Sequence, residues 1–166
     1  TLFILCPYDY REDKKMKVLI VDDEEMIRNV LREYVEFEGN EAYEASDGIQ
    51  AVKMCRENDY DIILMDVMMP ALDGFSAVKE IHKFKDIPVI MLSARGEEYD
   101  KLFGFEVGAD DYVTKPFSPK EVMARIAAVT KRHKAGAAAR ETLKFEGLEI
   151  DMKGRNVYVD GEKLEL

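Results

Sequence analysis

The stretch Asp61-Ile-Ile-Leu-Met-Asp66-Val-Met-Met-Pro70 places one carboxylate directly after an apolar run. The run Ile62–Met65 has the length and composition of a strand that is buried on both faces of a sheet. Strands of this kind occur almost only in parallel sheets that helices cover on both sides. Because an unpaired aspartate is almost never fully buried, we expect Asp66 to have a specific role at the end of this strand.

The same pattern recurs along the chain from Met16 onward, where apolar runs alternate with segments of helical periodicity. We predict strands at residues 18–21, 41–45, 62–65, 88–92 and 112–114. We predict helices around 27–35, from Asp47, around 75–81, over 97–107, and from the capping box Ser118-Pro-Lys-Glu121. This order predicts an α/β fold, with a doubly wound parallel sheet that helices cover on both faces.

The two ends of the chain differ from this pattern. Residues 1–15 are expected to be an extension upstream of the domain, with an additional strand as the alternative. We expect the last helix to end at residues 131–134, with a linker over 135–141. From Leu143 the apolar residues alternate and glycine-containing turns follow, which predicts a small antiparallel β meander over 142–166. A meander this short does not fold alone, so we expect it to begin a second domain.

Bulk composition excludes several classes of protein. The chain of 166 residues is 47% hydrophobic and 35% charged, which suits one domain plus a fragment. A net charge of −10 argues against non-specific binding to nucleic acid. No apolar run approaches the roughly 18–20 residues of a membrane span. Cys6 and Cys55 fit no metal-binding spacing, so we expect a reducing, cytoplasmic location.

Ligands of open parallel sheets bind beyond the carboxyl ends of the strands. That rule selects Asp22 and Asp23 after the first strand, Asp66 after the third, Ser93 after the fourth and Lys115 after the fifth. Helix capping is the alternative for one of the first two aspartates. A turn is the alternative for Asp66, a loop cap for Ser93, and a solvent-exposed position for Lys115. None of these alternatives explains why the five residues meet at one edge.

Carboxylates about 4 Å apart repel each other by roughly 4 kcal/mol per pair at an effective dielectric constant near 20. The cluster therefore predicts a bound cation, and Mg²⁺ fits because it prefers oxygen ligands and is held by carboxylates with waters and a phosphate. A lysine and a divalent ion beside a carboxylate predict phosphoryl transfer. In that reaction Asp66 is the candidate nucleophile, and Ser93 donates a hydrogen bond to the phosphoryl oxygens.

Four motifs, in order and at matching spacing, resemble the receiver domain of bacterial two-component response regulators. They are Val18-Leu-Ile-Val-Asp-Asp-Glu24, Leu64-Met-Asp-Val-Met-Met-Pro70 with Asp73-Gly74, Ser93-Ala94, and Gly108-Ala-Asp-Asp-Tyr-Val-Thr-Lys-Pro-Phe117. The resemblance covers Met16 to about Arg132, and we expect the receiver domain to span residues 16–134. It implies a flavodoxin-like fold whose five parallel strands have the order 2-1-3-4-5.

The resemblance also implies roles for individual residues. Asp66 is expected to accept a phosphoryl group from a sensor histidine kinase. Asp23, Asp66 and the backbone carbonyl of Met68 are expected to bind Mg²⁺ directly, with Mn²⁺ as an alternative ion. Asp22 is expected to act on the ion mostly through water.

Three further residues receive roles from the same resemblance. Lys115 is expected to pair with the phosphoryl group and to precede a cis peptide bond to Pro116. Ser93 and Tyr112 are expected to form a switch pair, in which the hydroxyl moves to the phosphate and the aromatic ring turns inward.

The second part of the chain resembles the OmpR/PhoB subfamily, in which such a meander begins a winged-helix DNA-binding domain. That domain would be incomplete at Leu166, so the protein is expected to control transcription although this chain does not bind DNA specifically. The subfamily also implies a homodimer on phosphorylation, through the fourth helix, fifth strand and fifth helix. The charge pairs expected across its twofold axis are Lys101 with Glu121, Asp111 with Arg125, and Asp110 with Arg132. A solvated surface is the alternative.

Two other functions are alternatives for this sequence. A Mg²⁺-dependent aspartyl-phosphate hydrolase typically has a second aspartate two residues after the nucleophile, where this chain has Met68. We therefore expect a phospho-acceptor that promotes its own phosphorylation and dephosphorylation, rather than a multi-turnover enzyme. A phosphorylation-independent pseudo-receiver, which acts only as an interaction module, is the other alternative. The acidic loop after the first strand excludes a dinucleotide binder, because it would repel a pyrophosphate.

Overall fold

The structure is a computed structural model that describes residues 14–94, 106–145, 148–151, 156–159 and 162–164. Its first part contains β1 (Lys17–Val21), α1 (Glu25–Phe37), β2 (Glu41–Ala45), α2 (Gly48–Glu57), β3 (Ile62–Asp66), α3 (Gly74–His82), β4 (Val89–Ser93), β5 (Asp111–Thr114) and α5 (Pro119–Glu141). The five strands form a sheet of order β2-β1-β3-β4-β5, in which all pairs are parallel. This confirms the predicted flavodoxin-like topology.

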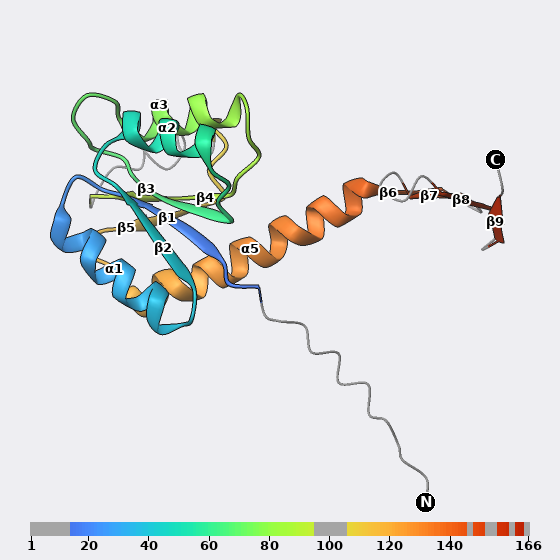
Figure 1. The fold of residues 1–166 in the computed structure, drawn as a ribbon, viewed down its shortest axis with the longest axis horizontal. Helices are drawn as coiled ribbons and strands as arrows, with labels where there is room; N and C mark the ends of the chain where they lie inside the picture. The colour runs from blue at the N-terminus through green and yellow to red at the C-terminus, as the bar shows by residue number, and fades with distance from the viewer. Residues whose placement is uncertain (1–13, 95–105, 146–147, 152–155, 160–161, 165–166) are drawn as a thin grey trace, which may run out of the picture.

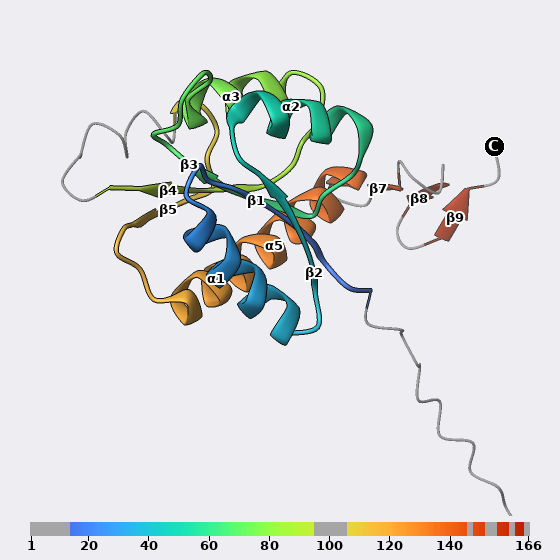
Figure 2. The ribbon, with the colours of Figure 1, turned by 60° about the vertical axis from the view of Figure 1, so that its left-hand side comes forward.

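Helices cover both faces of the sheet, with α2 and α3 on one face and α1 and α5 on the other (Figures 1 and 2). Successive residues of a strand point to opposite faces, and here both sets are buried. Leu19, Ile63 and Met91 pack in the cluster under α2 and α3. Ile20, Leu64 and Leu92 pack in the cluster under α1 and α5. Each such side chain contributes about 1.5–3 kcal/mol by leaving water, so the sheet is a rigid support for its edge.

The strand order sets which loops are neighbours. The chain places β2 at one edge of the sheet, then returns to the other side of β1 for β3. Val21 is in register with Met65 in the β1–β3 pair, so Asp22 and Asp66 follow side by side. Such a reversal point is where open α/β sheets bind ligands.

The strand ends differ slightly from the predicted ones. β3 and β4 each extend one residue further and end on Asp66 and Ser93. The amide of Val67 still donates to the carbonyl oxygen of Leu92, 2.9 Å away. Both polar residues are therefore part of the sheet, which fixes their backbone. Of the helix predicted over 97–107, residues 97–105 lie outside the described part of the chain, as does most of the extension predicted over 1–15.

The helix end predicted at residues 131–134 is wrong, because α5 continues as a helix to Glu141. That residues 135–141 link two domains stays a prediction. The segment was assigned to a linker from its alanine and glycine content. Alanine has the highest helix propensity, and one interior glycine costs only about 1 kcal/mol. Gly136 has no neighbouring atom near the position of a Cβ.

The second part of the chain forms the predicted antiparallel meander. Its strands are β6 (Thr142–Phe145), β7 (Leu148–Asp151), β8 (Asn156–Val159) and β9 (Glu162–Leu164), in the order β6-β7-β8-β9. Ile150 of β7 is paired with Leu143 of β6 and with Val157 of β8, and Val157 is in turn paired with Leu164 of β9. The alternating apolar residues thus occupy matching register positions across the meander, as their period of two predicts. Within the described residues, none of the helices has the length and apolar character needed to cross a membrane.

The helical conformation of residues 135–141 is testable at Gly136. We expect Gly136→Pro to reduce the helical signal in far-UV circular dichroism, because an interior proline costs a helix about 3 kcal/mol. Gly136→Ala is the control and should preserve or raise that signal. Since residue 136 is exposed, the urea midpoint of the domain should not change. Equal spectra for the two variants would contradict a continuous α5.

Candidate functional site

Three aspartates meet at the carboxyl ends of β1 and β3, as the strand order requires. Asp22, Asp23 and Asp66 each offer one carboxylate oxygen, and these oxygens all lie within 4.8 Å of one another. Asp22 and Asp66 are buried, with 0% and 4% of their surface exposed, whereas Asp23 is exposed. Two buried carboxylates at this separation need positive charge nearby.

Lys115 supplies that charge from the end of β5. Its Nζ donates to Asp22 Oδ2 at 2.8 Å and lies 3.2 Å from Asp66 Oδ1. The Lys115 side chain is only 17% exposed. Its backbone amide donates to the carbonyl oxygen of Ser93 at 2.6 Å, and the bond to Pro116 is cis, as expected. The lysine is therefore fixed at both its backbone and its ammonium group.

The surroundings of Asp66 favour its neutral form more than water does. Burial, reinforced by the charge of Asp22, raises the pKa of Asp66 to about 6, against the opposing effect of Lys115. Burial alone would lower the pKa of Lys115, but the hydrogen bond to Asp22 and the charge of Asp66 outweigh it and raise that pKa. Lys115 thus remains charged while the carboxylates compete for it. Perturbed ionisation of this kind clusters at functional sites.

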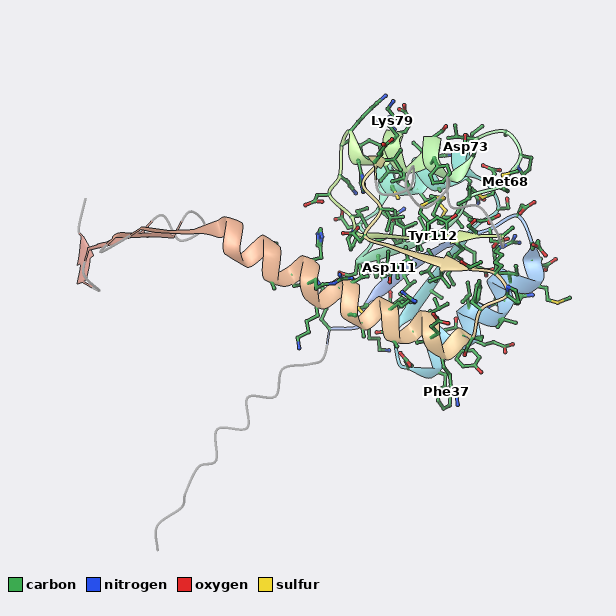
Figure 3. The ribbon with its side chains drawn as sticks, turned by 180° about the vertical axis from the view of Figure 1, so that it is seen from behind. Phe37, Met68, Asp73, Lys79, Asp111 and Tyr112 are labelled. Atoms are coloured by element: carbon green, nitrogen blue, oxygen red, sulfur yellow. The ribbon has the colours of Figure 1, made fainter. Side chains whose placement is uncertain are left out.

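The donor set fits a hard divalent cation. The three carboxylates offer oxygen atoms only, which Mg²⁺ prefers, and a second positive charge would relieve the repulsion that raises the pKa of Asp66. Asp23 opens the cluster to solvent, which gives an ion access. The role predicted for the backbone carbonyl of Met68 stays a prediction. Its side chain is 72% exposed and lies close to the start of α3 in Figure 3.

The two residues predicted to form a switch lie on neighbouring strands. The Ser93 side chain is buried, and its hydroxyl donates to the carbonyl oxygen of Ala94 at 3.1 Å. The Tyr112 side chain is also buried, within the cluster under α2 and α3 (Figure 3). Its ring therefore already lies inward in this structure. The change of position predicted for the pair stays a prediction.

Sequence reasoning missed the role of two residues near the cluster. Glu24 Oε1 lies 3.8 Å from Lys115 Nζ, and its only signal in the sequence is that it directly follows the two aspartates. At Gly74, a Cβ would overlap the carbonyl oxygen of Asp66. The Gly74 amide donates to the carbonyl oxygen of Val67 at 2.9 Å. Any larger residue would displace the strand end that carries Asp66.

Three of the residues predicted for a dimer interface, Asp111, Glu121 and Arg125, are joined by ion pairs within one chain. Arg125 Nη1 donates to both carboxylate oxygens of Asp111, at 3.0 and 2.9 Å, and Arg125 also pairs with Glu121 at 2.9 Å. The pair predicted between two copies, Asp111 with Arg125, is therefore intramolecular here. The sequence could not distinguish the two cases, because β5 and α5 are neighbours both in one chain and in the expected dimer.

The remaining residues of that predicted interface behave differently. Asp110 Oδ2 accepts a hydrogen bond from the amide of Val89 at 2.9 Å, at the start of β4. Its pairing with Arg132 of a second copy stays a prediction. Arg132 is exposed on α5. Lys101 lies outside the described residues.

Comparisons with known proteins agree with this geometry. Residues 18–127 match the family of response regulator receiver domains. The transcriptional regulatory protein SrrA of Staphylococcus aureus (strain NCTC 8325 / PS 47) is 42% identical over 156 residues, which is 90% of this chain. The chain spans 65% of the length of that relative.

Two solved structures extend the comparison. The response regulator DrrB of Thermotoga maritima, an OmpR/PhoB homologue, is 29% identical with a TM-score of 0.66, over 92% of this chain and 67% of DrrB. The receiver domain of a sensor histidine kinase from Pseudomonas aeruginosa PAO1 is 31% identical with a TM-score of 0.65, over 70% of this chain and 98% of that domain. That second structure has a magnesium ion coordinated in its active-site cleft.

The raised pKa of Asp66 predicts how the stability of the metal-free protein depends on pH. Above about pH 6 the folded protein must hold this carboxylate ionised in a buried site, whereas the unfolded chain ionises it from about 3.8. The penalty is full above the folded pKa and vanishes below the unfolded one, where both states are protonated. Asp66→Asn should therefore raise the free energy of unfolding by about 1–3 kcal/mol near pH 7 and by much less near pH 4.

Urea denaturation in the presence of a chelator measures this difference. A gain in stability of equal size at both pH values would show that Asp66 is not under electrostatic strain. A lower stability of Asp66→Asn than of the wild type near pH 7 would also show that Asp66 is not under electrostatic strain.

Proposed function

The chain belongs to the response regulator receiver domain family, and on this premise we propose that Asp66 accepts a phosphoryl group from a sensor histidine kinase in a Mg²⁺-dependent reaction. One observation carries the proposal. The ammonium group of Lys115 contacts Asp22 and Asp66 at once, inside a cluster of three carboxylates. This arrangement concentrates charge of both signs around one buried carboxylate at a sheet edge. It is the arrangement that positioning and charge stabilisation of a phosphoryl group require.

The proposed transfer forms a bond between a carboxylate oxygen of Asp66 and phosphorus. The phosphorus–nitrogen bond of a phosphohistidine breaks, and the imidazole nitrogen keeps the electron pair and takes a proton. Asp66 acts in its ionised form, which Lys115 favours against burial. Lys115 is already 3.2 Å from Asp66 Oδ1, so its ammonium group can pair with the oxygens of a phosphoryl group on that residue.

Asp22, Asp23 and Asp66, with the carbonyl of Met68, are the residues that we propose hold the Mg²⁺ ion; Mn²⁺ has the same ligand preferences. When bound, the ion offsets negative charge on the phosphoryl oxygens. The chain's own contribution is to keep these ligands together before the ion arrives. Asp22 is held in place because its Oδ1 accepts a hydrogen bond from the amide of Glu24 and its Oδ2 accepts one from Lys115.

We propose that Ser93 reports the phosphorylated state. Its hydroxyl would leave the carbonyl oxygen of Ala94, 3.1 Å away, and donate to the phosphoryl group. Ser93 is in register with Thr114 and its carbonyl accepts from the Lys115 amide. A shift at the end of β4 would therefore reach β5, which carries Tyr112. A change at Asp66 would thus alter the position of β5 and of the surface that β5 forms with α5.

As a regulator of transcription in the cytoplasm, the protein would act through a DNA-binding domain that begins at residues 142–166. We propose that phosphorylation favours a dimer through the surface of β5 and α5. Charged residues of both signs lie there: Asp111, Glu121, Arg125 and Arg132. Such charges set register and partner choice.

Dimerisation is measured by light scattering of the chain with beryllofluoride and Mg²⁺. The average mass should increase toward that of a dimer, and Arg125→Ala should reduce the increase because it removes charge from the surface. An unchanged mass despite confirmed binding of the phosphate mimic would overturn the dimer and leave the acceptor proposal intact.

The acceptor proposal is tested by intact-protein mass spectrometry. Acetyl phosphate with Mg²⁺ should add about 80 Da, the mass of one phosphoryl group, and Asp66→Asn should abolish the gain. Asp73→Asn is the matched control, because Asp73 follows the same strand but caps α3 through Ser76, a role that asparagine also fills. Omission of Mg²⁺ should strongly reduce the gain. An unchanged mass of the wild-type chain would refute the proposal.

The same experiment separates the two alternative functions. An aspartyl-phosphate hydrolase would release many equivalents of inorganic phosphate from small phosphate esters. A pseudo-receiver would show no phosphorylation although Mg²⁺ and acetyl phosphate are present.

A further inference from the structure

Arg28, on the first turn of α1, makes contacts that connect the acidic cluster to the edge of the sheet. We propose that Arg28 is a positioning residue that fixes the backbone of the two consecutive metal-binding aspartates, and that Glu44 on β2 orients Arg28 for this task. The inference rests on the proposed function, since it concerns the same Mg²⁺ site. It assigns roles to two residues that the phosphoryl-transfer mechanism above does not use.

The contacts of Arg28 are made to the backbone, not to the carboxylates. Its Nη1 donates to the carbonyl oxygen of Asp22 at 2.8 Å and lies 3.3 Å from that of Asp23. The Arg28 side chain is only 16% exposed. One guanidinium nitrogen thus bridges two successive peptide groups of the loop between β1 and α1. Because those peptide groups set the directions of the two carboxylates, the bridge fixes how the aspartates face Asp66.

The loop has few other contacts that could do this. The Glu24 residue that caps α1 makes no side-chain hydrogen bond to the helix. The Asp22 amide continues the sheet by donating to the carbonyl oxygen of Ala45 at 3.2 Å. The Glu24 amide donates to Asp22 Oδ1 at 2.9 Å. Among the described contacts, those of Arg28 are the ones that hold the two carbonyl groups. Asp22 is a buried residue, and a buried carbonyl group that loses its donor is costly, so the loop would rearrange without Arg28.

Glu44 completes the arrangement from the neighbouring strand. Its Oε1 lies 3.3 Å from Arg28 Nε, and its Oε2 accepts from Arg32 Nη1 at 2.8 Å. Glu44 is in register with Ile20 of β1, two residues before Asp22, and α1 lies beside β1 and β2 (Figure 1). One edge of the Arg28 guanidinium thus faces Glu44 while another nitrogen faces the loop. A lysine carries all its N–H donors on one nitrogen and cannot bridge both partners in this way.

Position and charge predict opposite effects on metal binding. A positive charge near three carboxylates repels a cation, so if Arg28 acted through charge alone, its removal would strengthen Mg²⁺ binding. If Arg28 acts by holding the loop, its removal weakens binding, as the loss of outer-shell partners typically does by about 10–100-fold. The direction of the change therefore identifies the role.

The experiment is an NMR titration of the unphosphorylated, ¹⁵N-labelled chain with MgCl₂, which needs no phosphoryl transfer. We expect Arg28→Met to raise the dissociation constant by about 10-fold or more. Arg28→Lys should raise it by a smaller factor, because lysine keeps the charge and can still donate to one of the partners. Glu44→Gln should weaken binding by about 2–10-fold. Arg32→Met is the matched control: Arg32 shares Glu44 and the same helix but has no described contact with the loop, so its dissociation constant should stay at the wild-type value.

Each outcome decides between the possibilities. Unchanged or stronger Mg²⁺ binding by folded Arg28→Met overturns the positioning role and leaves the proposed function standing. Wild-type protein that does not bind Mg²⁺ overturns both. An equal loss in Arg32→Met would assign the effect to α1 as a whole, and also overturns the proposal. If Arg28→Met does not fold, Arg28→Lys and Glu44→Gln decide in its place, and wild-type affinity in both refutes the inference.

Discussion

The contact of one lysine with two carboxylates organises this structure. Lys115 Nζ lies 2.8 Å from Asp22 and 3.2 Å from Asp66, and both acidic residues are buried. Burial of two carboxylates without a cation would be strongly unfavourable. The arrangement is possible because β1 and β3 are neighbours and the end of β5 reaches the same edge of the sheet. A site with incomplete charge compensation results, which fits the Mg²⁺ ion that we propose binds there.

The rest of the fold serves to keep that edge in place. The β3 strand is buried along its whole length, and Gly74 allows the next helix to approach the carbonyl of Asp66 closely. On the other side, Arg28 and Glu44 tie the loop after β1 to the sheet edge. Asp66 is therefore held by packing, whereas Asp22 and the loop that carries Asp23 are held by hydrogen bonds. Such rigid support lowers the reorganisation needed when a charged group is transferred.

Much of this could be predicted from the sequence, because the relevant signals are local. Apolar runs such as 62–65 identify strands, and the position of Asp66 after one of them places it at the sheet edge. Three other features depend on contacts between distant segments. The contacts of Arg28 with Glu44 join residues of α1 and β2, the close approach at Gly74 depends on backbone geometry, and the pairing of Arg125 with Asp111 depends on which copy supplies each residue. The helical conformation of 135–141 was missed because composition alone was read as a linker.

The central claim is that Asp66, rather than either neighbouring aspartate, carries the phosphoryl group. Borohydride reduction of the phosphorylated chain converts an aspartyl phosphate to homoserine, and peptide mass mapping locates the product. The account predicts homoserine at residue 66, with Asp22 and Asp23 unchanged, because Asp66 is the carboxylate that we propose as the nucleophile, at the end of β3. Homoserine at residue 22 or 23, with an intact Asp66, would contradict it.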